Sequence, residues 1–236
     1  MINLEKALMK KRIVYLAILA AVFALVTPAK AILYDIQKEL ALYTYLNQNT
    51  IPGPLAPYMC GPAAVVNSYG YLENKYPWAY DHKLIPDLNG NGVFQDLSDL
   101  QQVALTLAAP AYMNTTIPNG TFHDDLIWGK WLYLEQKVPG VTIYKAQDQW
   151  AWNNQLRPKP AWVAPQWPTW DFLYNELVHC EDVEILFSWS EGGHFVTLSS
   201  FHWDDANNNG VIDFAENATI DYVNPWTGLV GNSQIW

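Results

Sequence analysis

The feature that most constrains this chain is a Cys-Gly-Pro turn that runs directly into an apolar helical pattern. Cys60-Gly61-Pro62 precedes two alanines and further apolar residues up to Leu72, and proline is well tolerated in the first turn of a helix. The pattern predicts a helix over 61–72, with the thiol of Cys60 at its N-terminus. The helix dipole and the free backbone N–H groups at that end favour a thiolate.

A histidine far downstream provides a partner for this thiol. Gly192-Gly193-His194 opens an alternating stretch that continues to Trp203, which predicts a strand with an imidazole at its head. Asn224 follows in a Val-Asn-Pro segment. Cysteine, histidine and asparagine in this chain order suit nucleophilic catalysis, in which the amide oxygen holds the histidine tautomer. We therefore expect Cys60, His194 and Asn224 to form a catalytic site.

Cys60 and Cys180 are the two cysteines of the chain. In an oxidising compartment they can form one disulfide, which would forbid thiol catalysis. The alternative is two free thiols, with Cys180 half-buried before a strand and outside the site. The catalytic interpretation requires free thiols.

Residues 1–31 are typical of a secretory signal peptide. Lys10-Lys11-Arg12 is a basic segment, 13–26 is an apolar run, and Ala29-Lys30-Ala31 fits a cleavage site. The apolar run is shorter than the about 20 residues that span a bilayer. We expect a secreted or cell-surface protein without membrane contact after cleavage.

The charge of the remaining chain excludes some partners. Removal of residues 1–31 takes away five basic residues and one acidic residue, which moves the formal net charge from −10 to −14. Such an acidic surface argues against nucleic acid and anionic membranes as partners, and it suits a calcium-rich exterior. The length of 32–236 fits one domain.

Helical patterns come early in the chain and strand patterns come late. Besides 61–72, helices are expected over 96–109, 121–137 and 170–178, and strands over 141–144, 183–189, 194–203 and 218–223. Residues 32–47 suit either a helix or a strand, and the Trp- and Pro-rich segment 146–170 is expected to be irregular. This order predicts an α+β fold, in which a helical layer packs on an antiparallel sheet.

Residues 205–216 match a twelve-residue EF-type calcium loop position by position. Oxygen-bearing side chains stand at positions 1, 3, 5, 9 and 12, a backbone carbonyl serves position 7, and a glycine at position 6 allows the turn. Strand patterns flank the loop, so we expect a structural clip and not a sensor that opens. The expected ligands are Asp205, Asn207, Asn209, the carbonyl of Val211, Asp213 and Glu216.

A second segment, 87–99, repeats the first half of this motif and then departs from it. Position 12 is Ser98, with Asp96 and Asp99 close by. We expect a looser calcium loop, although a plain Asn-Gly turn gives a similar pattern. The expected ligands are Asp87, Asn89, Asn91 and the carbonyl of Val93.

Together these segments resemble the papain-like cysteine peptidases of the bacteriocin-processing type (family thirty-nine) and their secreted relatives. The resemblance rests on Cys-Gly-Pro-Ala-Ala, on Gly-Gly-His-Phe-Val-Thr-Leu and on an Asx-Pro pair, and it covers most of residues 51–230. It implies a papain-like fold with Cys60 as nucleophile, His194 as general base and Asn224 as the residue that orients the imidazole.

The chain departs from this family in the oxyanion hole. The family usually carries a glutamine about six residues before the cysteine, and here that position is Pro54. Gln48 and Asn49 lie further upstream and reach the site only if the Pro-rich approach bends back. Loss of an oxyanion donor costs roughly 10²–10³ in turnover. The backbone N–H of Cys60 would remain as one donor.

Two functions therefore compete. The first is a secreted, calcium-stabilised cysteine peptidase that hydrolyses peptide bonds of a peptide or protein substrate; an amidase or acyltransferase would use the same residues. The second is a catalytically inactive papain-like, calcium-binding surface or binding module, with the Trp-rich segment as its contact surface. For the tryptophans from Trp150 to Trp170, packing within an irregular segment is favoured over lining a groove.

Overall fold

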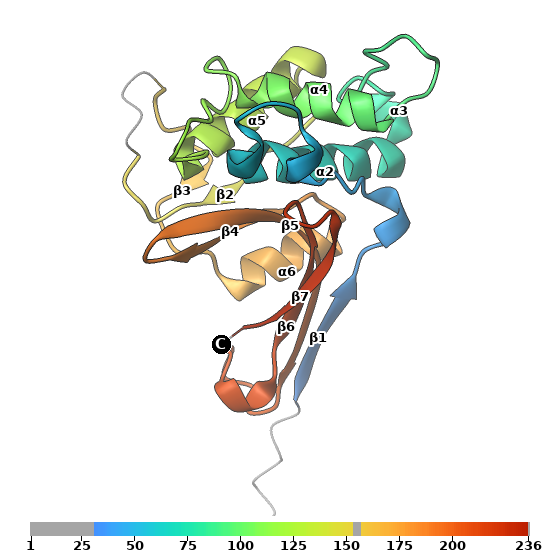
Figure 1. Ribbon diagram of the computed structural model, residues 1–236. Coiled ribbons are helices and arrows are strands. Elements are labelled where there is room, and N and C mark those ends of the chain that lie inside the picture. The colour runs from blue at the N-terminus through green and yellow to red at the C-terminus, as the bar shows by residue number, and fades with distance from the viewer. Residues whose placement is uncertain (1–30, 153–156, 236) are drawn as a thin grey trace, which may run out of the picture.

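A computed structural model describes residues 31–152 and 157–235, so the predicted signal peptide, apart from Ala31, lies outside the described residues. Figure 1 shows a layer of helices above a curled antiparallel sheet, with one further helix against a face of the sheet. The predicted α+β class is confirmed. Within the described ranges, none of the helices has both the length and the apolarity needed to cross a bilayer.

The helical layer is built around α2. This helix, Cys60–Lys75, begins one residue earlier than predicted, and most of its residues are buried. The side chain of Asp96 accepts a hydrogen bond from the N–H of Asp99 and so caps the next long helix. The other members of the layer are α3 (Pro77–Tyr80), α4 (Leu97–Ala108) and α5 (His123–Lys137).

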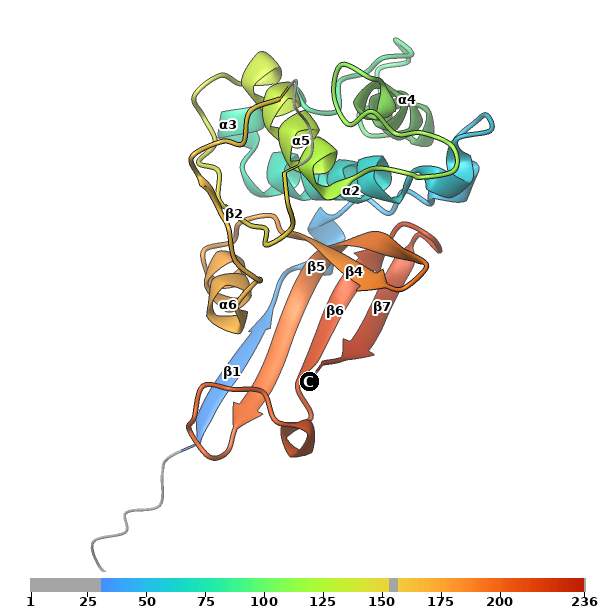
Figure 2. The same ribbon diagram turned by 90° about the vertical axis from the view of Figure 1, so that its left-hand side faces the viewer.

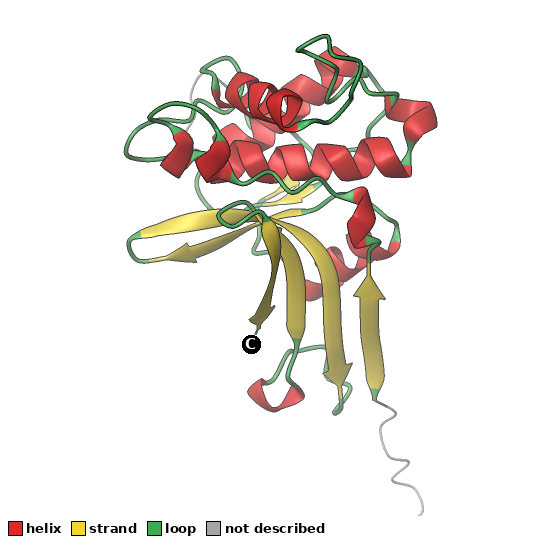
Figure 3. Ribbon diagram, turned by 45° about the vertical axis from the view of Figure 1, so that its right-hand side comes forward, coloured by secondary structure: helices red, strands yellow, loops and turns green. Residues whose placement is uncertain are grey.

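The sheet is organised around one long strand, β5, which spans Gly192–Asp205. Its first half pairs with β4 (Glu184–Trp189) and its second half with β1 (Ile32–Gln37). On the other side β5 pairs with β6 (Thr219–Asn224), with a register shift between Leu198 and Ser200. All these pairs are antiparallel, and β7 (Leu229–Gln234) adds the outer strand beside β6. Figure 3 shows the curl that this long bent strand gives the sheet.

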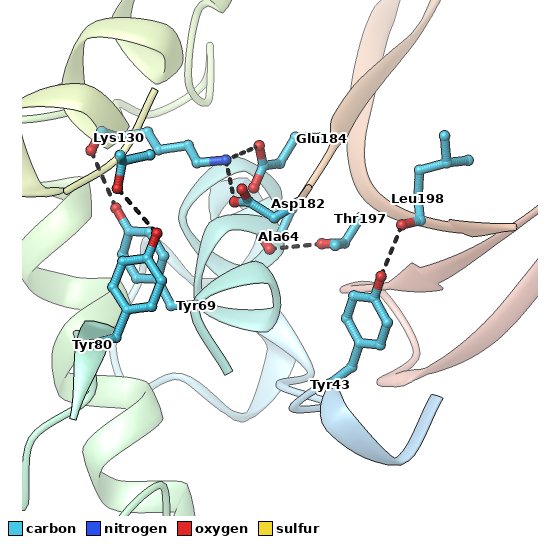
Figure 4. Close-up of polar contacts among 10 residues, drawn as sticks. Tyr43, Ala64, Tyr69, Tyr80, Lys130, Asp182, Glu184, Thr197 and Leu198 are labelled. Carbon is cyan, nitrogen blue, oxygen red and sulfur yellow. Dashed lines mark hydrogen bonds and ion pairs between the residues drawn. The ribbon is translucent and has the colours of Figure 1, made fainter. Parts of the chain in front are cut away.

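Polar contacts tie the helical layer to the sheet, as Figure 4 shows. The Oγ1 of Thr197 on β5 donates to the carbonyl of Ala64 on α2 at 2.7 Å. Lys130 on α5 forms ion pairs with Asp182 at 2.5 Å and Glu184 at 2.6 Å. Burial opposes the charge on Lys130, but the attraction of the two carboxylates outweighs it and raises the pKa of the lysine. These contacts fix the helix that carries Cys60 over the strand that carries His194.

Two apolar cores lie on either side of the sheet. One is formed where α2, α4 and α5 meet the sheet, and it includes Tyr69, Leu107 and Phe195. The other lies under α6 (Trp170–Val178), the helix seen beside the sheet in Figure 2, and it includes Phe201 and Trp203.

The structure corrects two elements of the sequence analysis. No strand forms over 141–144: Val141 and Ile143 are exposed, Ile143 by 84%, and Tyr144 alone of the apolar side chains there packs against the core. Instead a two-residue strand, β2 (Ala146–Gln147), pairs in parallel with β3 (Val163–Ala164) inside the segment expected to be irregular. The outer strand β7 was not predicted. The remaining short elements are the 3₁₀ turns η1 (Leu40–Leu42), η2 (Gln48–Thr50), η3 (Ala56–Tyr58) and η4 (Phe214–Glu216).

Candidate functional site

Cys60 is the first residue of α2, as the Cys-Gly-Pro turn predicted. The next residue, Gly61, lies tightly against the segment that leads into α5. A Cβ on Gly61 would meet the Thr121 side chain at 3.0 Å and the Leu126 side chain at 3.2 Å, so a larger residue would have to displace them. Cys60 itself is partly buried, and it is a free cysteine, as is Cys180. The disulfide alternative is therefore absent from this structure.

The protonation of Cys60 differs from the sequence expectation. Burial raises the pKa of the thiol, although the backbone N–H groups of Phe195, Gly61 and Cys60 itself act to lower it. The helix N-terminus thus supplies the expected donors, but desolvation of the thiolate outweighs them. Burial therefore favours the neutral thiol, and a base that takes its proton would assist the reaction of Cys60.

His194 and Asn224 meet at the end of the sheet nearest the helical layer. His194 lies at the start of β5, Asn224 is the last residue of β6, and the His194 Nε2 lies 2.9 Å from the Asn224 Oδ1. Next to His194, Gly193 allows β5 to lie close to β4, because a Cβ at this position would meet the Leu186 side chain at 2.8 Å and the carbonyl of Phe187 at 3.0 Å. The asparagine that the sequence analysis placed beside the histidine is thus its hydrogen-bond partner.

A second hydrogen bond fixes the tautomer of His194. The backbone N–H of Trp226 donates to the same Asn224 Oδ1 at 2.9 Å. That atom must therefore be the amide oxygen, an acceptor, so His194 Nε2 carries the proton and donates it. In the neutral ring this leaves Nδ1 with a free lone pair, which is the state that a general base requires. The ring of Trp226 stands nearly perpendicular to the imidazole at a centroid separation of 6.1 Å.

The thiol lies beside the histidine segment but is not hydrogen-bonded to the imidazole. The N–H of Phe195, the residue after His194, interacts with the Cys60 sulfur. In the described part of the chain no hydrogen bond joins that sulfur to the His194 ring. Catalytic hydrogen bonds are often loose before a substrate binds.

An N-terminal arm, residues 44–50, connects the cysteine helix to the asparagine turn. The N–H of Leu46 donates to Asn67 Oδ1 on α2 at 2.7 Å, and the N–H of Gln48 donates to the carbonyl of Pro225 at 2.7 Å. Asn49 Nδ2 adds a bond to the carbonyl of Trp226 at 3.0 Å. The arm therefore sets the distance between α2 and the turn that follows Asn224.

Gln48 has a structural role that the sequence did not reveal. The approach to Cys60 does bend back toward it, but its Nε2 donates to the carbonyls of Ala56 at 3.2 Å and Pro57 at 2.9 Å. Both amide hydrogens are thus used within the approach, and Pro54 is exposed. The Gln48 amide is therefore not free to donate to an oxyanion, and Asn49 Nδ2 already donates to the carbonyl of Trp226.

A cavity of about 390 Å³ lies between α5, β4 and the Trp-rich segment 146–170. Its lining includes Phe187, which pairs with His194 across β4 and β5, but it does not include Cys60, His194 or Asn224. His123 and Asp148, 2.7 Å apart, form part of the wall. The tryptophans thus line a cavity, against the expectation that packing alone accounts for them: Trp150, Trp162, Trp167 and Trp170.

The 205–216 loop connects β5 to β6, as the strand patterns indicated. It lies at the opposite end of this hairpin from His194 and Asn224 (Figure 1). Asp205 is 1% exposed, and its carboxylate accepts the N–H groups of Asn209 at 3.0 Å and Gly210 at 3.0 Å. The Nδ2 atoms of Asn207 and Asn209 point to Asp213 Oδ2 at 2.8 and 3.3 Å. The side chains at positions 1, 3, 5 and 9 therefore gather in one loop.

Glu216, at position 12 of the loop, has a carboxylate oxygen that a bound cation could contact. Its Oε2 accepts the indole N–H of Trp203 at 2.9 Å and the N–H of Asp213 at 3.0 Å, whereas its buried Oε1 has no hydrogen-bond partner of ordinary geometry in the described chain. The backbone N–H groups of Asp213, Asn207 and Ala206, together with the Trp203 indole, lower the pKa of this carboxyl group. An unpaired buried carboxylate oxygen is costly, and a cation would satisfy it. In the described ranges no three His, Cys, Asp or Glu side chains converge on a metal position; the loop's donor set instead includes amide and carbonyl oxygens, which suit calcium.

Comparison with known proteins yields no relative. No protein-family model, curated protein or solved structure matches the chain.

Proposed function

We propose that this chain is a secreted, papain-like cysteine peptidase whose fold is stabilised by calcium. The observation that carries the proposal is the hydrogen bond from His194 Nε2 to Asn224 Oδ1, with the second donor, Trp226 N–H, on the same oxygen. It leaves a basic Nδ1 in the segment whose next residue, Phe195, interacts with the Cys60 thiol. Secretion is inferred from the signal-like residues 1–31 and the acidic remainder of the chain.

The reaction begins with a neutral thiol. As the Cys60 sulfur attacks the carbonyl carbon of a peptide bond, His194 Nδ1 takes the thiol proton. The tetrahedral intermediate then expels the amine, which receives that proton from His194, and an acyl-thioester remains on Cys60. Water enters, gives a proton to His194 and attacks the thioester, and the released Cys60 sulfur recovers the proton. Asn224 stabilises the transient imidazolium by holding the ring in place.

Stabilisation of the oxyanion is the weak part of this site. The backbone N–H of Cys60 is available at the N-terminus of α2, but the family's glutamine is replaced by Pro54 and the Gln48 amide is used elsewhere. Loss of one such donor lowers turnover by roughly 10²–10³. We therefore expect slow cleavage of a peptide or protein substrate.

The same observations favour a second candidate, an inactive papain-like binding module. The missing donor and the neutral thiol would be tolerated in a protein that only binds, and the Trp-lined cavity would provide its contact surface. The acidic charge argues against nucleic acid as a partner of either form.

Calcium in the 205–216 loop would act on stability and not on the chemical step. Its ligands would be Asp205, Asn207, Asn209, the carbonyl of Val211, Asp213 and Glu216, and the unpaired Glu216 Oε1 supports the fit. An ion that binds only the folded chain stabilises it by mass action. The loop closes the far end of the β5–β6 hairpin, so binding would secure the strand pairing that brings His194 to Asn224.

The test is a cleavage assay. The purified protein is incubated with calcium and a mixed peptide library, and new termini are detected by mass spectrometry. The peptidase proposal expects slow cleavage that is lost in Cys60→Ala and retained in the matched control Cys180→Ala. Retention of peptides without any cleavage would favour the binding module. Cleavage that survives Cys60→Ala would rule out the proposed nucleophile.

A further inference from the structure

The 87–99 segment shares the internal hydrogen bonds of the 205–216 loop. Asp87 Oδ1 accepts the N–H groups of Gly90 and Asn91 at 2.7 and 3.1 Å, and its Oδ2 accepts that of Gly92 at 2.8 Å. Asp205 binds its own loop in the same way, through Asn209 and Gly210. Such bonds alone describe a turn, and a site for an ion requires further oxygen ligands from the residues after Gly92.

The second half of the segment is displaced by one residue. Gln95 has a φ of 60°, which places an extra residue in the left-handed region before the next acidic side chain. The Nδ2 atoms of Asn89 and Asn91 then point to Asp96 Oδ2, at 2.8 and 2.6 Å. In the other loop the equivalent asparagine amides point to Asp213 Oδ2. Asp96 therefore stands where Asp213 stands, although it comes at position 10 and not at position 9.

Asp99 completes this correspondence. It follows Asp96 by the same interval at which Glu216 follows Asp213. Asp99 is 0% exposed, and its Oδ1 accepts the N–H of Leu88, inside the loop, at 2.8 Å. Its Oδ2 is buried and has no hydrogen-bond partner in the described part of the chain. Glu216 Oε1 is in the same state.

A buried carboxylate oxygen without a partner needs an explanation. Leaving such a group unpaired is unfavourable, and a charged group is costlier than a neutral one. The carboxylate of Asp99 is held against the loop by the bond from the Leu88 N–H to its Oδ1, and its buried Oδ2 is left without a partner. A hard divalent cation supplies what Oδ2 lacks.

We propose that 87–99 is a second calcium site, in a loop one residue longer than the EF-type length, with Asp96 and Asp99 in place of Ser98 as its closing acidic ligands. The full donor set is Asp87, Asn89, Asn91, the carbonyl of Val93, Asp96 and Asp99. On binding, the two asparagine amides exchange their N–H contacts with Asp96 for contacts between their oxygens and the ion. Carboxylate, amide and carbonyl oxygens in a flexible loop are the ligands that calcium takes.

This site would act on the helical layer. Asp96 caps α4 and Asp99 lies in its first turn. Gln95 Nε2 donates to Glu73 Oε2 on α2 at 2.8 Å, and Glu73 Oε1 accepts the N–H groups of Leu84 and Ile85. An ion at the loop would therefore strengthen the junction of α2 and α4, whereas an ion at 205–216 would strengthen the distant end of the sheet.

The experiment counts bound ions by native mass spectrometry of the purified protein, titrated to about 1 mM Ca²⁺, the range of extracellular calcium modules. The wild type should bind two ions. Asp99→Asn should bind one, and Glu216→Gln should bind one through loss of the other site. Ser98→Ala, the matched control at the nominal position 12, should keep two.

Folding is checked by far-UV circular dichroism. If Asp99→Asn does not fold, Asp96→Asn replaces it, because asparagine keeps the helix cap while it removes the charge; it should also bind one ion. The proposal is overturned if a folded variant at Asp96 or Asp99 binds as many ions as the wild type, or if Ser98→Ala loses one. A wild type that binds a single ion, lost in Asp99→Asn and kept in Glu216→Gln, would count against the 205–216 site alone. Since no outcome depends on cleavage, the result is independent of the peptidase proposal.

Discussion

Lys38 offers the most quantitative test of the packing between the sheet and the helical layer. It is 5% exposed, its Nζ has no hydrogen-bond partner in the described chain, and that atom lies 4.4 Å from the centroid of the Tyr71 ring. Burial lowers the pKa of Lys38 from 10.5 to about 8, against the attraction of Asp182, Cys180 and Glu181. We predict that Lys38→Met stabilises the protein at neutral pH.

The magnitude follows from the pKa. The fall from 10.5 to about 8, at about 1.4 kcal/mol per pH unit, means that the charged lysine costs the folded state about 3 kcal/mol at pH 7. Methionine keeps a long apolar side chain without this cost, but it loses the contact of the cation with Tyr71. The net gain in the free energy of unfolding should be about 1–3 kcal/mol at pH 7.

The pH dependence provides the sharper result. Between pH 8 and 10.5 the unfolded chain binds the proton that folded Lys38 has released, so the stability of the wild type rises with pH relative to the variant. The advantage of Lys38→Met should shrink by about 2 kcal/mol between pH 7 and 9.5. Urea unfolding at each pH measures it, with the exposed Lys83→Met as control. A difference that stays constant with pH refutes the reasoning.

Three further predictions concern the layers, the site and the loop. Lys130→Met leaves Asp182 and Glu184 buried without their cation and should lower the free energy of unfolding by about 3–5 kcal/mol. Lys145→Met removes the cation of an exposed ion pair and should lower it by less than about 1 kcal/mol. Equal losses for the two variants in urea unfolding would contradict this prediction. Gly193→Ala places a Cβ 2.8 Å from Leu186, so it should lower the free energy of unfolding by about 1–3 kcal/mol and slow alkylation of Cys60. The control Gly192→Ala, whose Cβ would meet only Trp189 at 3.8 Å, should leave both the stability and the alkylation rate unchanged. Glu216→Gln should lower the melting temperature in calcium and reduce the loss caused by a chelator; a wild-type melting curve that a chelator leaves unmoved would show that the loop binds no ion.

The strongest sequence signals gave the elements that position the site. The Cys-Gly-Pro turn and the helical patterns of 96–109 and 170–178 are local signals, and the structure places α2, α4 and α6 close to the predicted ranges. Strand β7 could not be predicted, because Leu229–Gln234 is largely polar and becomes a strand only by pairing with β6. The apolar residues around Ile143 led to the opposite error, a predicted strand that does not form, because none of the described strands pairs with this stretch.

The contact between His194 and Asn224 could be predicted from the sequence, whereas the states of Cys60 and Gln48 could not. The pairing of His194 with Asn224 was expected from the chain order of cysteine, histidine and asparagine, but the raised pKa of Cys60 depends on burial that only the packed structure creates. The role of Gln48 depends on an approach segment that folds back over it. In the 87–99 loop a single left-handed residue, Gln95, moves the later acidic residues out of the twelve-residue count, so that counting positions pointed to Ser98 and not to Asp99.

The most direct test of the central claim is the rate at which iodoacetamide alkylates Cys60 at pH 7, followed by mass spectrometry of the Cys60 and Cys180 peptides. Because burial raises the pKa of the Cys60 thiol, rapid alkylation near neutral pH requires His194 to take its proton. His194→Ala should slow alkylation of Cys60 by roughly tenfold or more and leave that of Cys180 unchanged. Equal Cys60 rates in the wild type and His194→Ala would contradict the account.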